Sequence, residues 1–338
     1  MEGKPPVLSV KCLTTQFIGR KNTSVTVVDG VDLVVRKGET LGIVGESGCG
    51  KSVTSLSIMR LLGKNGRVVG GQVEFQGTNI LALEEKEMRK IRGNRLAMIF
   101  QEPMTSLNPV LTIGRQIGEV LQLHTPLGWE ERKKRTIELI AQVGIPRAQD
   151  IFGEYPHRLS GGMRQRVMIA MAMACQPQLL IADEPTTALD VTIQAQMLTL
   201  IRDMRVKAGM SVMLITHDLG VVAEMCDRVL VMYAGQVIES ADVRTLLRHP
   251  KHPYTMGLIQ AVPHNARGKK RLYAISGNVP SPGEWPQGCR FAPRCQEVKP
   301  ICHTQNPPLL KMKDGSECRC WLHEPNETAE AAEGREVL

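Results

Sequence analysis

Apolar residues along this chain form short unbroken runs that alternate with segments in which they recur every three or four positions. An unbroken run is typical of a buried strand, and helical spacing marks an amphipathic helix. Strands are therefore expected at 7–10, 25–28, 31–35, 41–44, 73–75, 95–100, 178–184, 211–216, 228–233 and 236–240, and helices at 53–62, 82–92, 113–143 and 164–175. Strands and helices in this alternation predict an α/β fold.

Dipeptides that contain glycine mark two of the connections between these elements. Asp29-Gly30 predicts a turn between two of the early strands, and Ala234-Gly235 predicts the tip of a late hairpin. After Val262-Pro263 the regular spacing fades, and proline, glycine and basic residues dominate. We therefore expect a main domain at 1–262, a cysteine-rich extension at 263–323 and a disordered acidic tail at 324–338.

Composition narrows the class of protein. With 338 residues, 42% hydrophobic and 22% charged, the chain can form one large globular domain and a smaller one. The longest apolar run, 167–175, is about half of a membrane span, and no charged-then-apolar segment opens the chain, so we expect a cytosolic protein. The net charge of +8 suits nucleic acid, an anionic membrane surface or nucleotide phosphates, and it does not choose among them.

The segment Gly45-Glu46-Ser47-Gly48-Cys49-Gly50-Lys51-Ser52 fits the phosphate-loop pattern G-x-x-x-x-G-K-[ST]. It lies between an expected strand and an expected helix, which is the context that the motif requires. Its glycines let consecutive backbone N–H groups turn toward phosphate oxygens at the positive end of the helix dipole. Lys51 would reach the β and γ phosphates and Ser52 would ligate Mg²⁺, so the sequence predicts a nucleotide site.

Adjacent carboxylates end another expected strand. Asp183 and Glu184 lie at the carboxyl end of 178–184, where open α/β sheets keep their ligands. Asp183 suits binding of Mg²⁺ through water, and Glu184 suits orienting or deprotonating an attacking water. Gln101 and His217 also follow expected strands. The glutamine could coordinate a metal or be an ordinary loop residue, and the histidine could sense a γ phosphate or be structural.

Two further features allow two interpretations each. Ser160-Gly161-Gly162 precedes a helix and predicts either a second anion site or an ordinary helix capped by Ser160. Phe17 lies ahead of the phosphate loop, where its ring could stack on an adenine or belong to the core or a turn. The residues alone leave both questions open.

Taken in order, these motifs resemble those of the nucleotide-binding subunit of an ABC transporter. Walker A, Q-loop, signature, Walker B, D-loop and H-loop correspond to Gly45–Ser52, Gln101, Leu159–Met163, Leu179–Glu184, Ala188-Leu189-Asp190 and His217, and the resemblance spans roughly residues 7–262. It implies a P-loop ABC ATPase with a RecA-like mixed sheet core, an antiparallel β subdomain and a helical subdomain at about 102–160.

A narrower resemblance points to the ATPases of dipeptide and oligopeptide importers. It rests on Phe100–Pro109, Ala182–Thr192, His252–Thr255 and the cysteine-bearing extension. It implies an ATP-hydrolysing subunit, peripheral on the cytoplasmic face of a bacterial or archaeal cell membrane. The implied partners are two integral membrane permease subunits, a second ABC ATPase (a related chain or a second copy) and, indirectly, an extracytoplasmic substrate-binding protein; nucleic acid is not among them.

The same resemblance implies a role for each motif residue. Glu184 would be the catalytic base, Gln101 would coordinate Mg²⁺ and water, and His217 would contact the γ phosphate. Ser160, Gly161 and Gly162 would serve the ATP bound by the partner ATPase. The implied nucleotide-binding set is Phe17, Gly45, Ser47, Gly48, Cys49, Gly50, Lys51, Ser52, Val53, Asp183, Ser160, Gly161, Gly162 and Asp190, with Mg²⁺ held by Ser52 and Gln101.

Two other functions are compatible with the motifs. The same machine could import another cargo, such as nickel or opines, because similar ATPases serve those systems. A soluble ABC ATPase acting on translation or DNA is suggested by the positive charge. Against it, the chain carries one cassette and no long heptad insertion.

Five of the nine cysteines crowd into the last fifth of the chain. Cys289, Cys295, Cys302 and Cys320 are separated by five, six and seventeen residues, and thiols in a reducing cytosol suggest a metal. None of these gaps is the short C-x₂₋₄-C pair common in structural zinc sites, so a [4Fe-4S] cluster fits better, with zinc or uncoordinated thiols as alternatives. Cys318 could replace Cys320 as the fourth ligand, although the family's pattern favours Cys320.

Overall fold

The computed structural model describes residues 4–19, 23–101, 106–186, 190–262 and 273–323. The chain divides into two compact units, and each is described by itself. The first unit comprises Met1–Leu8, Val35–Thr40 and Phe75–Leu214, and the second comprises Ser9–Val34, Leu41–Glu74 and Ile215–Leu338. The expected acidic tail at 324–338, the loop at 102–105 and residues 187–189 lie outside the described residues.

A short parallel sheet forms the centre of the first unit. Its strands follow the order β8 (Ser211–Ile215), β7 (Leu179–Asp183) and β6 (Leu96–Ile99). β6 and β7 pair in parallel, with Leu96 opposite Leu179 and Ile99 opposite Ala182. Every residue of β7 and β8 is buried. This burial explains why both strands read as continuous apolar runs, and it confirms the strands expected there.

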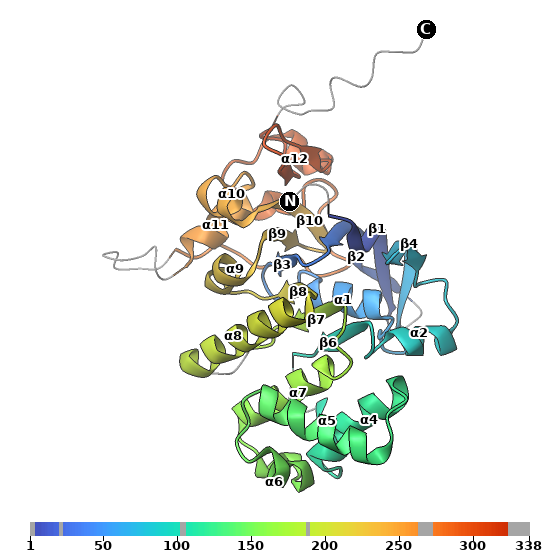
Figure 1. Ribbon diagram of the computed structural model, residues 1–338. Helices are drawn as coiled ribbons and strands as arrows, with labels where there is room; N and C mark the ends of the chain where they lie inside the picture. The colour runs from blue at the N-terminus through green and yellow to red at the C-terminus, as the bar shows by residue number, and fades with distance from the viewer. Residues whose placement is uncertain (1–3, 20–22, 102–105, 187–189, 263–272, 324–338) are drawn as a thin grey trace. The chain divides into compact units, whose positions relative to one another are not determined.

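Helices make up most of the rest of the first unit. Figure 1 shows α4 to α7 gathered in one region, coloured green to yellow-green. The helical pattern expected over 113–143 is two helices, because Pro126 and Gly128 fall in the connection between α4 and α5. The elements of this unit besides the sheet are β5 (Thr78–Asn79), α2 (Glu85–Ile91), α4 (Ile113–His124), α5 (Trp129–Gln142), α6 (Ala148–Gly153), η2 (Pro156–Arg158), α7 (Gly161–Met173) and α8 (Val191–Ala208).

The second unit contains a mixed sheet. Its strands follow the order β11 (Leu310–Lys311), β12 (Glu317–Cys318), β10 (Gln236–Asp242), β9 (Arg228–Tyr233) and β3 (Thr40–Val44). β3 and β9 pair in parallel, whereas β9 and β10 form the expected antiparallel hairpin. β12 pairs with β10, placing Cys318 opposite Glu239. The extension therefore continues this sheet, which its fading periodicity did not predict.

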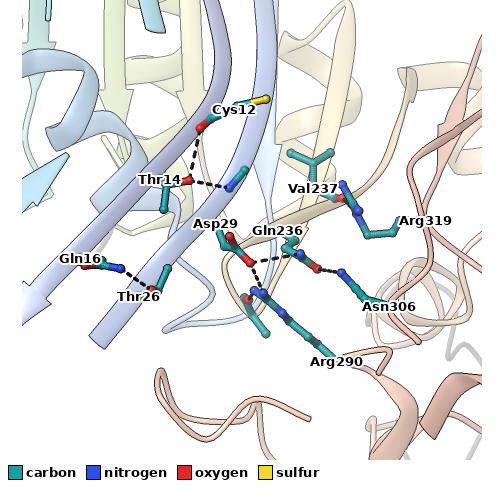
Figure 2. Close-up of polar contacts among 12 residues, drawn as sticks. Cys12, Thr14, Gln16, Thr26, Asp29, Gln236, Val237, Arg290, Asn306 and Arg319 are labelled. Carbon is teal, nitrogen blue, oxygen red and sulfur yellow. Dashed lines mark hydrogen bonds and ion pairs between the residues drawn. The ribbon is translucent and has the colours of Figure 1, made fainter. Parts of the chain in front are cut away.

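A second sheet in the same unit has the strand order β2 (Ser24–Arg36), β1 (Pro6–Ile18) and β4 (Gly66–Phe75). The turn expected at Asp29-Gly30 is wrong, because β2 runs through both residues. Gly30 has a φ of +60°, and its N–H donates to the Thr14 hydroxyl over 3.2 Å (Figure 2). The glycine thus lets the strand bend without ending.

One hydrophobic core joins the mixed sheet to the extension. Tyr233, Tyr254 and Phe291 are buried together, and Trp285 packs against them. The helices of this unit are α1 (Lys51–Met59), α9 (Leu219–Met225), α10 (Val243–Arg248), α11 (Pro253–Gln260), η4 (Ala292–Arg294) and α12 (Ile301–Thr304). Among the described residues of the whole chain, none of the helices combines the length and apolar character needed to cross a membrane.

Candidate functional site

The phosphate-loop segment lies between β3 and α1, which confirms its expected strand–loop–helix context. Gly45, Gly48 and Gly50 have φ values of +154°, +81° and +103°. L-residues with side chains rarely adopt these values, so glycine is required for the curl of the loop. A Cβ on Gly45 would also collide with the carbonyl oxygen of Met232. The glycines therefore maintain a backbone cradle at the start of α1, where the helix dipole favours an anion.

Lys51 folds over this loop. Its side chain is buried, and its Nζ donates to the carbonyl oxygens of Gly45 over 2.7 Å and Glu46 over 3.0 Å. The ammonium charge is thus held against the cradle rather than in solvent, a position suited to phosphate oxygens. Burial raises the pKa of the Cys49 thiol despite the nearby Lys51 charge. Cys49 is therefore a neutral packing residue of the loop.

The first unit brings Gln101 and Glu184 together. The Gln101 amide donates to the Glu184 carboxylate over 3.0 Å. Asp183, the last residue of β7, is buried, and Glu184 follows it with a φ of +45°. A non-glycine residue in this left-handed conformation is strained, and such strain occurs mostly at functional sites. The strand end delivers two adjacent carboxylates, an arrangement that suits a metal ion and a water.

Two other predicted residues are helix caps in the first unit. The Ser160 hydroxyl accepts the Met163 N–H over 3.4 Å at the start of α7, and the Asp190 carboxylate accepts the Ile193 N–H over 3.0 Å at the start of α8. These contacts confirm the capping interpretation for Ser160. Among the residues that the structure describes, none would come within 4 Å of a Cβ on Gly161. The backbone at the start of α7 is therefore open to approach, as an anion site requires.

His217 and Phe17 belong to the second unit. His217 is exposed, and Asp218 after it caps α9 by accepting the Gly220 N–H over 2.7 Å. Phe17 lies at the end of β1, and a Cβ added to Gly66 would come within 2.9 Å of its ring. One part of the Phe17 ring is thus packed against β4. The role of each residue toward a nucleotide stays a prediction.

Sequence reasoning gave Tyr254 no role at the phosphate loop. Its hydroxyl accepts the Glu46 N–H over 2.8 Å from α11. The only signal was its place in His252–Thr255, a segment that carried the family resemblance without an assigned task. Contacts between segments so distant in sequence leave no pattern in either one.

The cysteines of the extension lie close enough to interact electrostatically. Burial, with smaller contributions from the neighbouring thiols Cys289, Cys295 and Cys302, raises the pKa of Cys320 to about 11. Burial raises the pKa of Cys318, and Glu239, Cys320 and Cys289 raise it too, against an opposing effect of Lys251. Both Cys318 and Cys320 therefore lie within the electrostatic influence of Cys289, and which of them is the fourth ligand stays a prediction. Across the part of the chain that the structure describes, no three His, Cys, Asp or Glu side chains are grouped so as to hold a metal ion.

Two protein-family models match the sequence of this chain. The model for "ABC transporter" matches residues 28–187. The model for "Oligopeptide/dipeptide transporter, C-terminal region" matches residues 238–302. The two matches cover the segments that hold the phosphate loop, the Asp183-Glu184 strand end and part of the cysteine-bearing extension.

Curated relatives match over nearly the whole chain. The oligopeptide transport ATP-binding protein AppD of Bacillus subtilis is 54% identical over 319 residues, covering 94% of this chain and 97% of AppD. The dipeptide transport ATP-binding protein DppD of Escherichia coli is 48% identical, covering 93% of this chain and 96% of DppD. Among solved structures, the dimeric post-hydrolysis ATP-binding cassette MJ0796, bound to ADP and Pi, is 28% identical with a TM-score of 0.63, covering 70% of this chain and 99% of that one.

Proposed function

Because the chain belongs to the ATP-binding proteins of the ABC transporter family, in the group with the oligopeptide/dipeptide transporter C-terminal region, we propose that it hydrolyses ATP to power peptide import. The single observation that carries this function is the presence of both matches in one chain: a cassette with a glycine cradle and a peptide-transporter C-terminal region. The cargo is a dipeptide or oligopeptide, as named for the relatives AppD and DppD.

ATP and Mg²⁺ fit the cradle. The positive φ values of Gly45, Gly48 and Gly50 leave backbone N–H groups for phosphate oxygens, and Lys51 supplies the cation beside them. Cys49 and Val53 flank these groups, and Ser47 belongs to the same loop. Ser52 would hold the metal at the start of α1, with Gln101 as a second ligand and Asp183 acting through a bound water. Bound Mg²⁺ would neutralise charge on the phosphates and on the leaving group.

The residues proposed to carry out hydrolysis follow the carboxyl ends of β6 and β7 in the first unit. Glu184 is the base that takes a proton from the attacking water, and Gln101 holds its carboxylate through the 3.0 Å hydrogen bond. The left-handed backbone of Glu184 supports this role, because strained residues of this kind cluster at functional sites. His217 contacts the γ phosphate, and Phe17 stacks on the adenine.

A second ATPase subunit completes each site. The open start of α7, with Ser160, Gly161 and Gly162, closes over the ATP of the partner, and Asp190 lies in the same interface. Among the matched structures, a dimeric cassette supports this arrangement. The partner is a related ATPase rather than a second copy. Both attach to two integral membrane permease subunits at the cytoplasmic face of the cell membrane, and an extracytoplasmic binding protein delivers the peptide.

A [4Fe-4S] cluster held by Cys289, Cys295, Cys302 and Cys320 is the finer part of this proposal. The mutual electrostatic influence of these thiols supports it. Each ligand must lose its proton to bind iron, so the cluster would remove the raised pKa values that burial imposes. The cluster would then hold together an extension with little core of its own.

Reconstitution tests the function. The chain is purified together with its permease subunits and partner ATPase, placed in lipid vesicles, and assayed for ATP hydrolysis with the binding protein loaded with dipeptide, nickel or opine. Stimulation by dipeptide alone is expected. Stimulation only by nickel or an opine would show that the transporter carries that cargo instead of a peptide, with the ATPase function unchanged. Failure to associate with any membrane subunit would favour a soluble ATPase.

A further inference from the structure

Arg294 of the extension forms an ion pair with the phosphate loop. Its Nη1 and Nη2 donate to the two carboxylate oxygens of Glu46 over 2.6 and 3.0 Å. The Arg294 side chain is only 5% exposed, and that of Glu46 is 31% exposed. A bidentate pair of this kind fixes both distance and orientation. The residue directly before Cys295 is therefore attached to the second residue of the loop.

The remaining contacts of Arg294 hold its guanidinium in one orientation. Its Nε donates to the Ser276 carbonyl oxygen over 2.8 Å, and Nη2 also donates to that of Ile275 over 3.3 Å. Nη1 donates in addition to the Tyr233 hydroxyl over 3.4 Å. Donors on every edge of the guanidinium are thus engaged, so the side chain acts as a rigid link between Glu46 and the extension.

Glu46 is fixed through its backbone as well. Its N–H donates to the hydroxyl of Tyr254, a fully buried residue. Tyr254 packs against Tyr233 and Phe291 with ring centroids 4.7 and 5.5 Å away. The Glu46 backbone therefore bonds directly to this aromatic cluster, and its side chain is linked to the cluster through Arg294. The extension contributes Phe291 to the cluster.

The extension also supports the far end of the loop, through the β9–β10 turn. The Gly235 N–H donates to the Cys49 carbonyl oxygen over 2.9 Å. A Cβ on Gly235 would come within 2.9 Å of the Trp285 ring, so the extension packs directly on this turn. Arg290 lies over that ring at 3.5 Å and donates to the Ala234 carbonyl oxygen over 2.5 Å.

Figure 2 shows how Arg290 is itself anchored. Its guanidinium pairs with the Asp29 carboxylate, which also accepts from the Gln236 amide over 3.5 Å. The Asn306 amide donates in turn to the Gln236 side-chain oxygen over 3.2 Å. These contacts tie the extension to β2 and β10, so the support behind the loop is a connected polar network rather than a single contact.

We propose that the cysteine-bearing extension positions the phosphate loop for ATP, with Arg294 as the positioning residue and Glu46 as the point at which it acts. The pair keeps the first turn of the cradle in place before the nucleotide arrives, and it neutralises a carboxylate that would otherwise repel the triphosphate. This inference rests on the proposed ATPase function and adds a second task to the extension.

Removing the guanidinium tests the proposal on the full-length chain. Equilibrium binding of ATP with Mg²⁺ is measured for the parent, Arg294→Gln and Arg294→Lys, and KM and kcat are measured in the assembled transporter. Arg294→Gln should weaken ATP binding by roughly tenfold or more, because hydrogen bonds to a charged group are lost. KM should rise while kcat at saturating ATP stays near the parental value. Arg294→Lys should retain part of the affinity, because lysine keeps the positive charge but cannot form the bidentate pair with Glu46.

Lys251→Gln is the matched control. Lys251 forms an ion pair of 2.7 Å with Asp314, which also ties the extension to the rest of the unit but does not touch the phosphate loop. This variant should bind ATP like the parent. If it weakens binding as much as Arg294→Gln does, the effect is a general loosening of the extension and the proposal is overturned.

Glu46→Gln removes the same pair from the other side and keeps the test decisive if Arg294→Gln does not fold. The two single variants and their double variant should be non-additive, because each breaks one shared interaction. Parental affinity in Arg294→Gln, or full additivity in the cycle, would overturn the proposal while the ATPase function stands. A parent chain that binds no ATP would instead overturn the proposed function, and this inference with it.

Discussion

The side-chain amide of Gln101 donates to the carboxylate of Glu184 over 3.0 Å. The two residues are 83 positions apart in the chain, and they meet because β6 and β7 are parallel neighbours whose carboxyl ends lie at one edge. A neutral amide holds the carboxylate without neutralising it, which suits the role of base proposed for Glu184.

Glu184→Gln should bind ATP normally and lose hydrolysis. The amide keeps the size of the side chain but cannot take a proton, and general-base catalysis is worth roughly a hundredfold to ten-thousandfold. Turnover of ATP and equilibrium binding are measured on the same preparation. Hydrolysis near the parental rate would show that Glu184 is not the base.

Gly45→Ala should abolish ATP binding and destabilise the chain by about 1–3 kcal/mol, since it puts a Cβ into a φ of +154° and against the Met232 carbonyl oxygen. Gly63→Ala is the control, because a Cβ there would meet none of the described residues within 4 Å. Calorimetric titration with ATP and urea unfolding measure the two effects. Equal behaviour of the two variants would contradict the required curl at Gly45.

The chain should lose stability as the pH falls below about 6.5, partly through His252. Burial lowers the pKa of this histidine to about 3, with a further contribution from His323. Its Nδ1 accepts the Tyr254 N–H over 3.0 Å, which requires the neutral ring. Because the unfolded chain takes up a proton that the folded histidine refuses until about pH 3, stability declines across this window by about 1.4 kcal/mol per pH unit.

His252→Asn isolates that contribution, since asparagine also caps a helix such as α11 but does not titrate. Urea unfolding of parent and variant is compared at pH 7.5 and 5.5. The other titrating groups are common to both proteins, so the difference between them should shrink at the lower pH. An unchanged difference would mean that the histidine takes up its proton as readily in the folded chain as in the unfolded one.

Cys320→Ser should remove the brown colour and the broad absorption near ~400 nm expected of anaerobically purified protein with a [4Fe-4S] cluster. Cys318→Ala should keep both, because Cys318 lies in β12 opposite Glu239 and the family resemblance favours Cys320 as the fourth ligand. Iron and acid-labile sulfide are measured alongside. If the parent protein is colourless and contains stoichiometric zinc, the cysteines hold zinc and the cluster proposal is wrong.

The sequence predicted those parts of the fold whose cause is local. β7 and β8 are buried on both faces, so their apolar runs were sufficient, and the phosphate loop needs glycine at fixed positions for backbone reasons alone. The turn expected at Asp29-Gly30 failed because its signal is equally compatible with a bent strand. The Asp29 N–H donates to the Gly235 carbonyl oxygen over 2.9 Å, a contact that no local pattern reveals.

The strands of the extension and its contacts with the phosphate loop could not be predicted either, because they too depend on partners distant in the sequence. β11 and β12 have two residues each and form by pairing with a strand already present. Arg294 reads as one basic residue among many in a loop-rich segment. Its significance comes from Glu46, which is 248 positions away.

That separation has a consequence during synthesis. Ribosomes add about 5–20 residues per second, so Arg294 follows Glu46 out of the ribosome by roughly 12–50 s over the 248 intervening positions. Throughout that interval the phosphate loop exists without the guanidinium that pairs with it, and β10, once synthesised, lacks its neighbour β12 until residues 317 and 318 have been added. The nucleotide site is therefore completed at the end of translation, and a chain interrupted before residue 294 carries every cassette motif without the support behind its phosphate loop.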